Sequence, residues 1–239
     1  MTWIPPNKPL GIKAYGSICH LPGSRLGPGD HKLNDGQARI LTEKTRDKHD
    51  RIIVQEKLDG SNVAIARVGG AILALGRSGY LAQTSKYEQH QLFADWVRRN
   101  ETRFQFLAEG QRLCGEWLAQ AHGTRYTLFH EPFVAFDLMT GSQRLPYEPF
   151  MAVVSPAGLV TPHVLSIGPP MSVAAAMAAL HADGRNGFHG AIDPVEGAVW
   201  RVERKGAVDF LGKFVRPDKQ DGCYLPEISG REAVWNWRP

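Results

Sequence analysis

The sequence predicts an α+β protein built mainly of antiparallel strands. Short apolar runs recur along the chain, and two of them, 63–68 and 71–75, are separated only by Gly69-Gly70. Two glycines between apolar runs are a strong hairpin signal, because both central positions of such a turn can need a positive φ. From Lys86 to Asn100 the apolar period becomes helical, which predicts a helix packed on a sheet.

Composition limits the class of protein. The 239 residues, 43% hydrophobic and 22% charged, are enough for a folded domain with a proper core. No apolar run is long enough for a membrane helix and the first residues do not resemble a signal peptide, so we expect a cytoplasmic protein without a membrane partner. The net charge of +4 is compatible with a polyanionic partner. Three widely spaced cysteines argue against a disulfide framework and a zinc module.

We expect one domain over residues 1–239, without internal repeats. Breakers dominate residues 1–35, which predicts an irregular surface segment, and residues 36–50 suit a short solvated helix or a loop. A proline-rich section over 146–170 precedes a helix at 173–181, which Ser172 caps and Gly184 stops. Further strands are predicted at 52–54, 112–118, 133–139, 196–202 and 207–215.

The most informative stretch runs from Val54 to Asn62. Lys57 stands where an apolar strand ends and a tight Asp59-Gly60 turn begins. A lysine that is desolvated at such a place is a candidate nucleophile. Judged on this stretch alone, an ordinary surface lysine beside a turn is the simpler interpretation.

Other apolar strands also carry a charge. A charge in apolar surroundings costs several kcal/mol unless it is paired or used. Five such charges of both signs, spread over more than half of the chain, predict the lining of a polar cleft; they are Lys57, Glu116, Asp137, Glu196 and Lys213.

These positions, in this order, resemble the motif series of the covalent nucleotidyltransferases. That superfamily comprises the DNA ligases, the RNA ligases and the mRNA-capping guanylyltransferases. The matching motifs are Lys57-x-Asp59-Gly60, Gly115-Glu116, Phe136-Asp137, Glu196-Gly197 and Lys213. Glu56, Ser61-Asn62 and the Phe136-Asp137 pair look most like the RNA ligases that seal nicks in duplex RNA. The chain ends soon after Lys213, so we expect a bare catalytic domain without an OB-fold appendage.

The resemblance implies a nucleotidyltransferase domain with the nucleotide lying in a cleft between its sheets. It also implies an ATP-dependent reaction that begins when a lysine amine attacks the α-phosphate and forms lysyl-AMP. AMP then moves to the 5′-phosphate of an RNA end, and a 3′-hydroxyl displaces it. Lys57 matches the nucleophile, whose ordinary pKa of about 10.4 must be lowered by burial or by a nearby cation.

The resemblance assigns the remaining residues around this lysine. Asp59 and Glu196 match the acids that organise Mg²⁺ or Mn²⁺, largely through the metal's water shell. Lys213 matches a direct contact to the α-phosphate, and Arg77 a cation that holds the phosphate of the nucleotide or of the 5′ end.

Five positions match residues around the nucleotide. Phe136 matches the aromatic that stacks on adenine, Glu116 the acid that bonds the ribose, and Glu56 a residue beside the adenine edge. Asn62 matches a residue used near the reacting ends, and Asp137 an acidic position of the same strand. Three of the matched residues have a plainer interpretation from the local sequence: Phe136 as core, Asn62 as turn closure and Arg77 as a solvated residue.

Two departures leave questions open. The last motif usually carries two basic residues one position apart, so either Lys213 acts alone or Arg216 serves as a displaced second cation. The second departure is that no C-terminal RNA-binding domain is recognisable. RNA would then be held by the domain's own basic residues or by an accessory RNA-repair protein. The candidate basic residues are Lys44, Arg46, Lys48, Arg51, Arg98 and Arg99. The alternatives to an RNA ligase are a minimal DNA ligase, a capping-type guanylyltransferase, and a non-catalytic nucleic-acid end-binding protein on the same fold.

Overall fold

The computed structural model describes residues 5–184 and 186–239. Contacts divide them into two compact units, each with a five-stranded sheet. The first unit contains the described residues up to Gly16 together with Ser61–Gln120 and Glu131–Thr161. The second contains Ser17–Gly60, Ala121–His130 and the described residues from Pro162 to Pro239.

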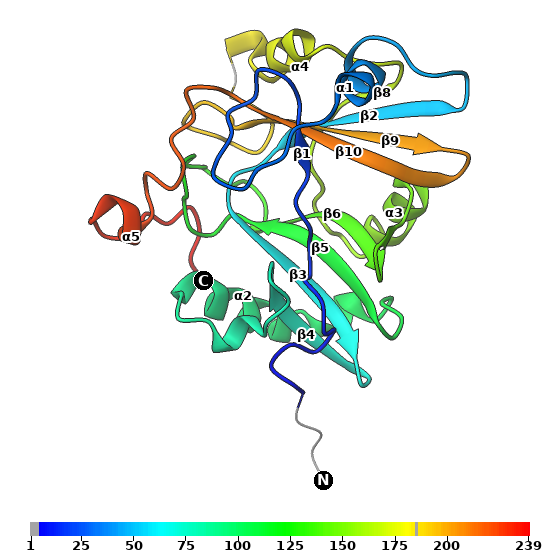
Figure 1. The fold of residues 1–239 in the computed structure, drawn as a ribbon. Helices are drawn as coiled ribbons and strands as arrows, with labels where there is room; N and C mark the ends of the chain where they lie inside the picture. Colours follow the sequence, from blue (N-terminus) through cyan, green and yellow to red (C-terminus); the bar gives the residue numbers. More distant parts are fainter. Residues whose placement is uncertain (1–4, 185) are drawn as a thin grey trace. The chain divides into compact units, whose positions relative to one another are not determined.

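The sheet of the second unit has the strand order β1-β10-β9-β2-β8. β1 is Cys19–His20, β2 Asp50–Lys57, β8 Val164–Gly168, β9 Gly197–Arg204 and β10 Ala207–Val215. All neighbours are antiparallel except β1 and β10. Helices α1 (Asp35–Thr42) and α4 (Val173–Leu180) lie on one face of this sheet, as Figure 1 shows. Fully buried Ile52, Val54 and Trp200 form the core with Leu41 and Leu180 of these helices.

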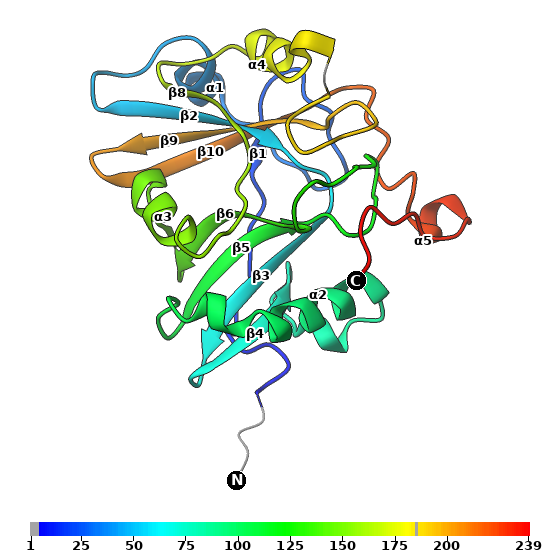
Figure 2. The same ribbon diagram turned by 180° about the vertical axis from the view of Figure 1, so that it is seen from behind.

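The sheet of the first unit has the order β4-β3-β5-β6-β7. β3 is Ser61–Val68, β4 Ala71–Gly76, β5 Gln111–Trp117, β6 Phe133–Thr140 and β7 Gln143–Arg144. Helix α2 (Glu88–Arg99) packs beside β4, and α3 (Tyr147–Val154) contacts β6; both are visible in Figure 2. Phe93 and Trp96 of α2 meet Trp117 and Phe133 of the sheet with ring centroids 5.2–5.8 Å apart.

Short helical turns complete the described elements. They are the 3₁₀ turns Ala82–Thr84, Glu101–Phe104 and Ala182–Gly184, and helix α5 (Pro226–Ser229).

The mixed α+β fold with mainly antiparallel sheets is confirmed. The predicted hairpin is β3–β4, and its turn places Gly69 at φ 60° and Gly70 at φ 77°, values that favour glycine. The predicted helix at 86–100 is α2, and the one at 173–181 is α4, whose N-cap Ser172 accepts a hydrogen bond from the amide of Ala175 at 3.2 Å.

Within residues 5–35, the described part of the predicted irregular segment, there is more order than the sequence predicts. In the first unit, Ala14 and Tyr15 are buried, and both amides donate to the carbonyl of Arg77. In the second unit, β1 pairs with Gly212 and Lys213 of β10. A two-residue strand has no sequence period of its own, because its pairing comes from a strand almost 200 residues away.

The proline-rich section also contains regular structure. Helix α3 begins directly after Pro146, a position that suits proline because the first helical amides have no partner within the helix. β8 is an edge strand of the second unit's sheet and pairs only with β2 among the described strands. Within the described ranges, no helix is both long and apolar enough to cross a membrane.

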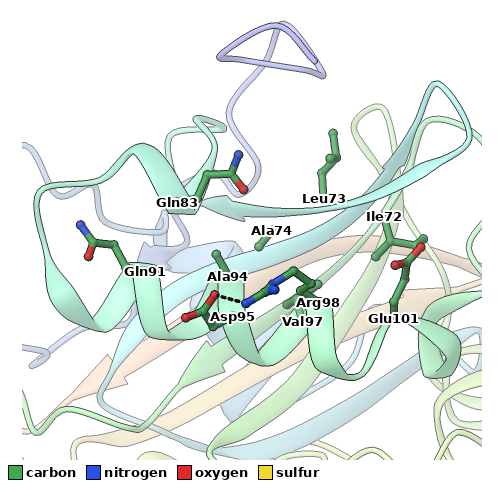
Figure 3. Close-up of a pocket in the computed structure, with 10 residues that line it drawn as sticks. All are labelled: Ile72, Leu73, Ala74, Gln83, Gln91, Ala94, Asp95, Val97, Arg98 and Glu101. Atoms are coloured by element: carbon green, nitrogen blue, oxygen red, sulfur yellow. Dashed lines mark hydrogen bonds and ion pairs between the residues drawn. The ribbon is translucent and has the colours of Figure 1, made fainter. Parts of the chain in front are cut away.

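A hollow of about 330 Å³ lies between β4 and α2 in the first unit (Figure 3). Ala74 and Val97 are among its apolar walls, and Gln83 and Glu101 among its polar ones. Figure 3 shows the ion pair of Arg98 with Asp95, whose N and O atoms are 2.9 Å apart. No residue of the motif series lines this hollow.

Candidate active site

Lys57 is the last residue of β2, as the sequence predicts. Its Cα partner across the sheet is Gly197, so Glu196 at the entrance to β9 lies beside it. Lys57 Nζ donates to Glu196 Oε2 at 2.6 Å and to the carbonyl of Leu58 at 3.4 Å. The Lys57 side chain is 20% exposed, so this lysine is held in an ion pair rather than freely solvated.

Lys213 comes to the same end of the sheet because β10, β9 and β2 are consecutive. It pairs with Val199, which pairs with Gln55, two residues before Lys57. Lys213 Nζ lies 3.8 Å from Asp30 Oδ1. The nucleophile candidate, an acid and a second cation therefore lie at the same end of the second unit's sheet.

Asp30 and His20 come from the segment that the sequence analysis interprets as an irregular surface loop. His20 Nε2 lies 3.1 Å from Asp30 Oδ2, and His20 Nδ1 lies 2.7 Å from Ser24 Oγ. Burial, followed by the charge of Lys213, lowers the pKa of His20. This loop therefore packs against the motif strand β10 and contributes to the surroundings of Lys213.

Asp59 sits in the turn after Lys57 and is tightly held. Its Oδ2 accepts hydrogen bonds from the amide of Gly123 at 2.8 Å and from Lys219 Nζ, and its own amide donates to Tyr126 Oη at 3.1 Å. Burial alone would raise the pKa of Asp59, but the charge and hydrogen bond of Lys219 outweigh it and the pKa is lowered. Asp59 is therefore an ionised carboxylate with a lysine counter-ion.

Glu56 and Glu196 are both buried. Burial raises the pKa of Glu196, and the charge of Lys57 opposes that rise. Burial also raises the pKa of Glu56, to about 7, although its Oε2 accepts a hydrogen bond from the amide of Phe188 at 2.8 Å. Glu56 Oε1 is buried without a hydrogen-bond partner among the described residues, so this oxygen has hydrogen-bonding capacity that a ligand could use.

Arg216 lies next to this site, and its polar groups are engaged. Its amide donates to the carbonyl of Glu196 and its Nε to the carbonyl of Val195 at 3.0 Å. Its guanidinium also pairs with the exposed Asp218 at 2.8 Å. Arg216 thus holds the backbone of Val195 and Glu196 in place just before β9.

In the first unit, register brings two predicted residues together. Asn62 of β3 is the Cα partner of Glu116 of β5. Asn62 Oδ1 is buried and has no hydrogen-bond partner within the described ranges. Arg77 follows β4 and is exposed.

Phe136 and Asp137 lie on β6. Phe136 is half-buried and its ring meets that of Tyr15 edge to face, with centroids 5.0 Å apart. Asp137 is 1% exposed, and its Oδ2 accepts hydrogen bonds from Tyr15 Oη at 2.7 Å and Arg144 Nε at 3.0 Å. Asp137 therefore has structural partners that the sequence did not indicate.

The basic residues considered for RNA binding are engaged to different degrees. Arg46 bonds Asp50 and Asp209 at 2.6–2.9 Å, and these contacts raise its pKa. The Arg51 guanidinium lies 3.9 Å from Glu203. These pairs reduce the positive charge that either arginine can offer to a phosphate.

In the described part of the chain, no group of three or more His, Cys, Asp or Glu side chains is placed to hold a metal ion. Asp59 and Glu196 do offer carboxylate oxygens, which Mg²⁺ and Mn²⁺ prefer. They are close enough for the charge of Asp59 to contribute to the raised pKa of Glu196. Two carboxylates suit an ion that keeps most of its waters.

Sequence reasoning missed Lys219, Gly123 and Tyr126. Lys219 stands in the polar run Pro217-Asp218-Lys219-Gln220-Asp221, which is typical of an exposed loop. Gly123 and Tyr126 lie in a segment without a motif or a period. No signal in one sequence identifies them, because only the folded chain brings them to Asp59.

A nucleophile candidate at a strand end, flanked by acids and cations on adjacent antiparallel strands, is the arrangement expected of a nucleotidyltransferase. The model of the RNA ligase family matches residues 50–215. The chain therefore belongs to the RNA ligase family. No curated protein matches the sequence significantly.

Two solved structures with TM-scores above 0.5 support the fold. An RNA ligase mutant from Naegleria gruberi with ATP and Mn is 18% identical, with a TM-score of 0.54, 97% of this chain covered and 66% of the other. A protein from Aquifex aeolicus assigned as an ATP-dependent DNA ligase is 17% identical, with a TM-score of 0.51, 84% of this chain covered and 49% of the other. An archaeal ATP-dependent RNA ligase is 20% identical, with a TM-score of 0.48 and 84% of this chain covered. This chain spans 48% of that archaeal chain.

Proposed function

We propose that this chain is an ATP-dependent RNA ligase that joins 3′-hydroxyl and 5′-phosphate ends through lysyl-AMP. The observation that carries the proposal is the contact of Lys57 Nζ with Glu196 Oε2 at 2.6 Å, at the ends of adjacent strands. A lysine on the surface of an ordinary turn would be solvated by water and would not be paired with a buried carboxylate. Membership of the RNA ligase family supports the proposal, as does the fold shared with ligases.

In the proposed first step, Lys57 loses a proton and its amine attacks the α-phosphorus of ATP. A P–N bond forms, the bond from the α-phosphorus to the bridging oxygen breaks, and pyrophosphate leaves. Glu196 Oε2 is within the distance at which a carboxylate can take the proton. Lys213, at the same end of the sheet, would bind the α-phosphate and stabilise the negative charge of its oxygens in the transition state.

Asp59 and Glu196 would hold a Mg²⁺ or Mn²⁺ ion, largely through its waters. Such an ion supplies positive charge that offsets the charge of the phosphate oxygens. Glu56, Asn62, Arg77, Glu116, Phe136 and Asp137 are proposed to bind the nucleotide or the RNA ends, on the strength of the motif resemblance. An accessory RNA-repair protein and a cytoplasmic location stay predictions from the sequence.

The intact mass of the purified protein tests the first step. We expect ATP and a divalent metal to add the mass of one AMP, and pyrophosphate with metal to remove it. Labelled GTP should give no adduct. Labelling by GTP and not by ATP would instead favour a capping-type enzyme. Nicked RNA compared with nicked DNA then tests the substrate: sealing of DNA only would refute the RNA ligase.

A non-catalytic end-binding protein is the alternative of another class. It would bind nicked RNA but acquire no AMP under any combination of nucleotide and metal. Absence of the adduct in wild type, with binding retained, would therefore replace our proposal by that one.

A further inference from the structure

Lys219 is a buried cation that no motif assigns. Its side chain is 1% exposed, and its Nζ donates to Asp59 Oδ2 and lies 3.3 Å from Thr124 Oγ1. Burying an ammonium group costs several kcal/mol unless a partner compensates it. Asp59, two residues after Lys57, is that partner, so Lys219 is linked directly to the turn that follows the nucleophile candidate.

The surroundings of this pair form a built cradle. The amide of Gly123 donates to the same Asp59 oxygen at 2.8 Å. A Cβ atom at Gly123 would lie 2.5 Å from Lys219 Nζ and 2.4 Å from the carbonyl oxygen of Gln220, closer than real Cβ atoms approach. Thr124 is fully buried. Glycine is therefore required for the segment to close over the pair.

Two of the ion pairs in this part of the second unit involve Lys57 or the turn after it: Lys57 with Glu196, and Lys219 with Asp59. The pairs interact, since the charge of Lys219 counters the raised pKa of Glu196. In the proposed reaction Lys57 loses its positive charge when its nitrogen bonds to phosphorus. Lys219 forms no new bond in this step and is paired with Asp59, whereas the guanidinium of Arg216 is engaged with Val195 and Asp218.

We propose that Lys219 is a positioning residue of the adenylylation site. It fixes the Asp59 carboxylate, and through it the turn after Lys57. This inference rests on the proposed function. It implies that a divalent ion can replace the ammonium group when that group is removed, because the Asp59 carboxylate would then lack its counter-ion.

The test replaces Lys219 by methionine, which keeps the length of the side chain and removes the charge. Lys86→Met, at an exposed lysine of the first unit, is the matched control. Two quantities are measured over a range of Mn²⁺ concentrations: the rate of AMP incorporation, and the thermal midpoint in the absence of nucleotide.

At low Mn²⁺ we expect K219M to incorporate AMP at least about tenfold more slowly than wild type, a change equivalent to about 1.4 kcal/mol. The difference in rate between K219M and wild type should become smaller as the Mn²⁺ concentration rises. Without metal, the thermal midpoint of K219M should lie below that of wild type, and Mn²⁺ should raise it more than it raises the wild-type value, because a ligand stabilises the state that binds it.

Two results would overturn the inference. One is a wild-type rate of AMP incorporation in K219M at every Mn²⁺ concentration. The other is a loss of rate and of thermal stability that Mn²⁺ does not change, which would make Lys219 a packing residue only.

The double variant D59N/K219M covers the case in which K219M does not fold, since it removes both buried charges together. We expect it to fold, to gain no stability from Mn²⁺ beyond that of wild type, and to incorporate AMP slowly at all Mn²⁺ concentrations. A wild-type rate in this variant would also refute the positioning role. If wild type itself takes no AMP, the proposed function fails, and the thermal response of K219M to Mn²⁺ still tests the Lys219–Asp59 link.

Discussion

Replacing Glu56 by glutamine should remove a pH dependence of stability that the fold imposes on this side chain. Glu56 is 2% exposed, and its carboxyl group accepts a hydrogen bond from the amide of Phe188 at 2.8 Å. Burial raises its pKa from an ordinary 4.5 to about 7. The folded protein therefore keeps a proton on Glu56 at pH values where the unfolded chain has released it.

The sign follows from this difference. Between pH 4.5 and about 7 the unfolded chain ionises Glu56 and the folded protein does not, so the free energy of unfolding falls as the pH rises through this window. One pKa unit corresponds to 1.36 kcal/mol, so the full effect is about 3 kcal/mol, complete above about pH 7. Glutamine cannot ionise, so the unfolding free energy of E56Q should not show this fall with rising pH.

The assay is urea unfolding of wild type and E56Q at about pH 4.5 and about pH 8, comparing the free energies of unfolding. Relative to wild type, E56Q should gain about 3 kcal/mol between the two pH values. Other groups titrate equally in both proteins, so the difference isolates Glu56. The exposed Glu232→Gln variant should show a difference close to zero. An E56Q difference independent of pH would refute the reasoning, because it would mean that Glu56 ionises in the folded protein as it does in the unfolded chain.

The remaining predictions concern single contacts. Lys57→Ala should abolish AMP incorporation, measured by intact mass, while circular dichroism shows an unchanged fold; an adduct in this variant would mean that another residue is the nucleophile. Gly123→Ala should lower both the thermal midpoint and the rate of AMP incorporation, because its Cβ would lie 2.4 Å from the backbone carbonyl oxygen of Gln220; unchanged values would show that this segment relaxes without cost. Tyr15→Phe removes the 2.7 Å hydrogen bond to buried Asp137 and should cost about 1–3 kcal/mol of unfolding free energy in urea titrations, and a cost near zero would show that Arg144 alone suffices.

Much of the strand pattern could be predicted from the sequence because it is local. The β3–β4 hairpin follows from two apolar runs and the Gly69-Gly70 turn, and the end of β2 at Lys57 follows from the change from apolar to turn residues. Helix α2 follows from its apolar period. In each case neighbouring residues carry the physical cause.

Elements that depend on distant partners could not be predicted in this way. β1 is two residues long and exists because β10 pairs with it. The Asp137 carboxylate is buried because Tyr15 and Arg144 reach it, and neither contact leaves a trace in the local sequence.

For the candidate site, the sequence by itself determined which residues to consider. Lys57, Asp59, Glu196 and Lys213 are charged residues at strand ends, in strands or in a turn, and they follow the order of the motif series. Tertiary structure alone decided how the charges pair. It set Glu196 against Lys57 through strand register and placed Lys219 on Asp59 from a polar loop. The physical reason is that a residue's type and neighbours are written in the sequence, whereas the compensation of a buried charge depends on which distant group the fold brings within hydrogen-bond distance.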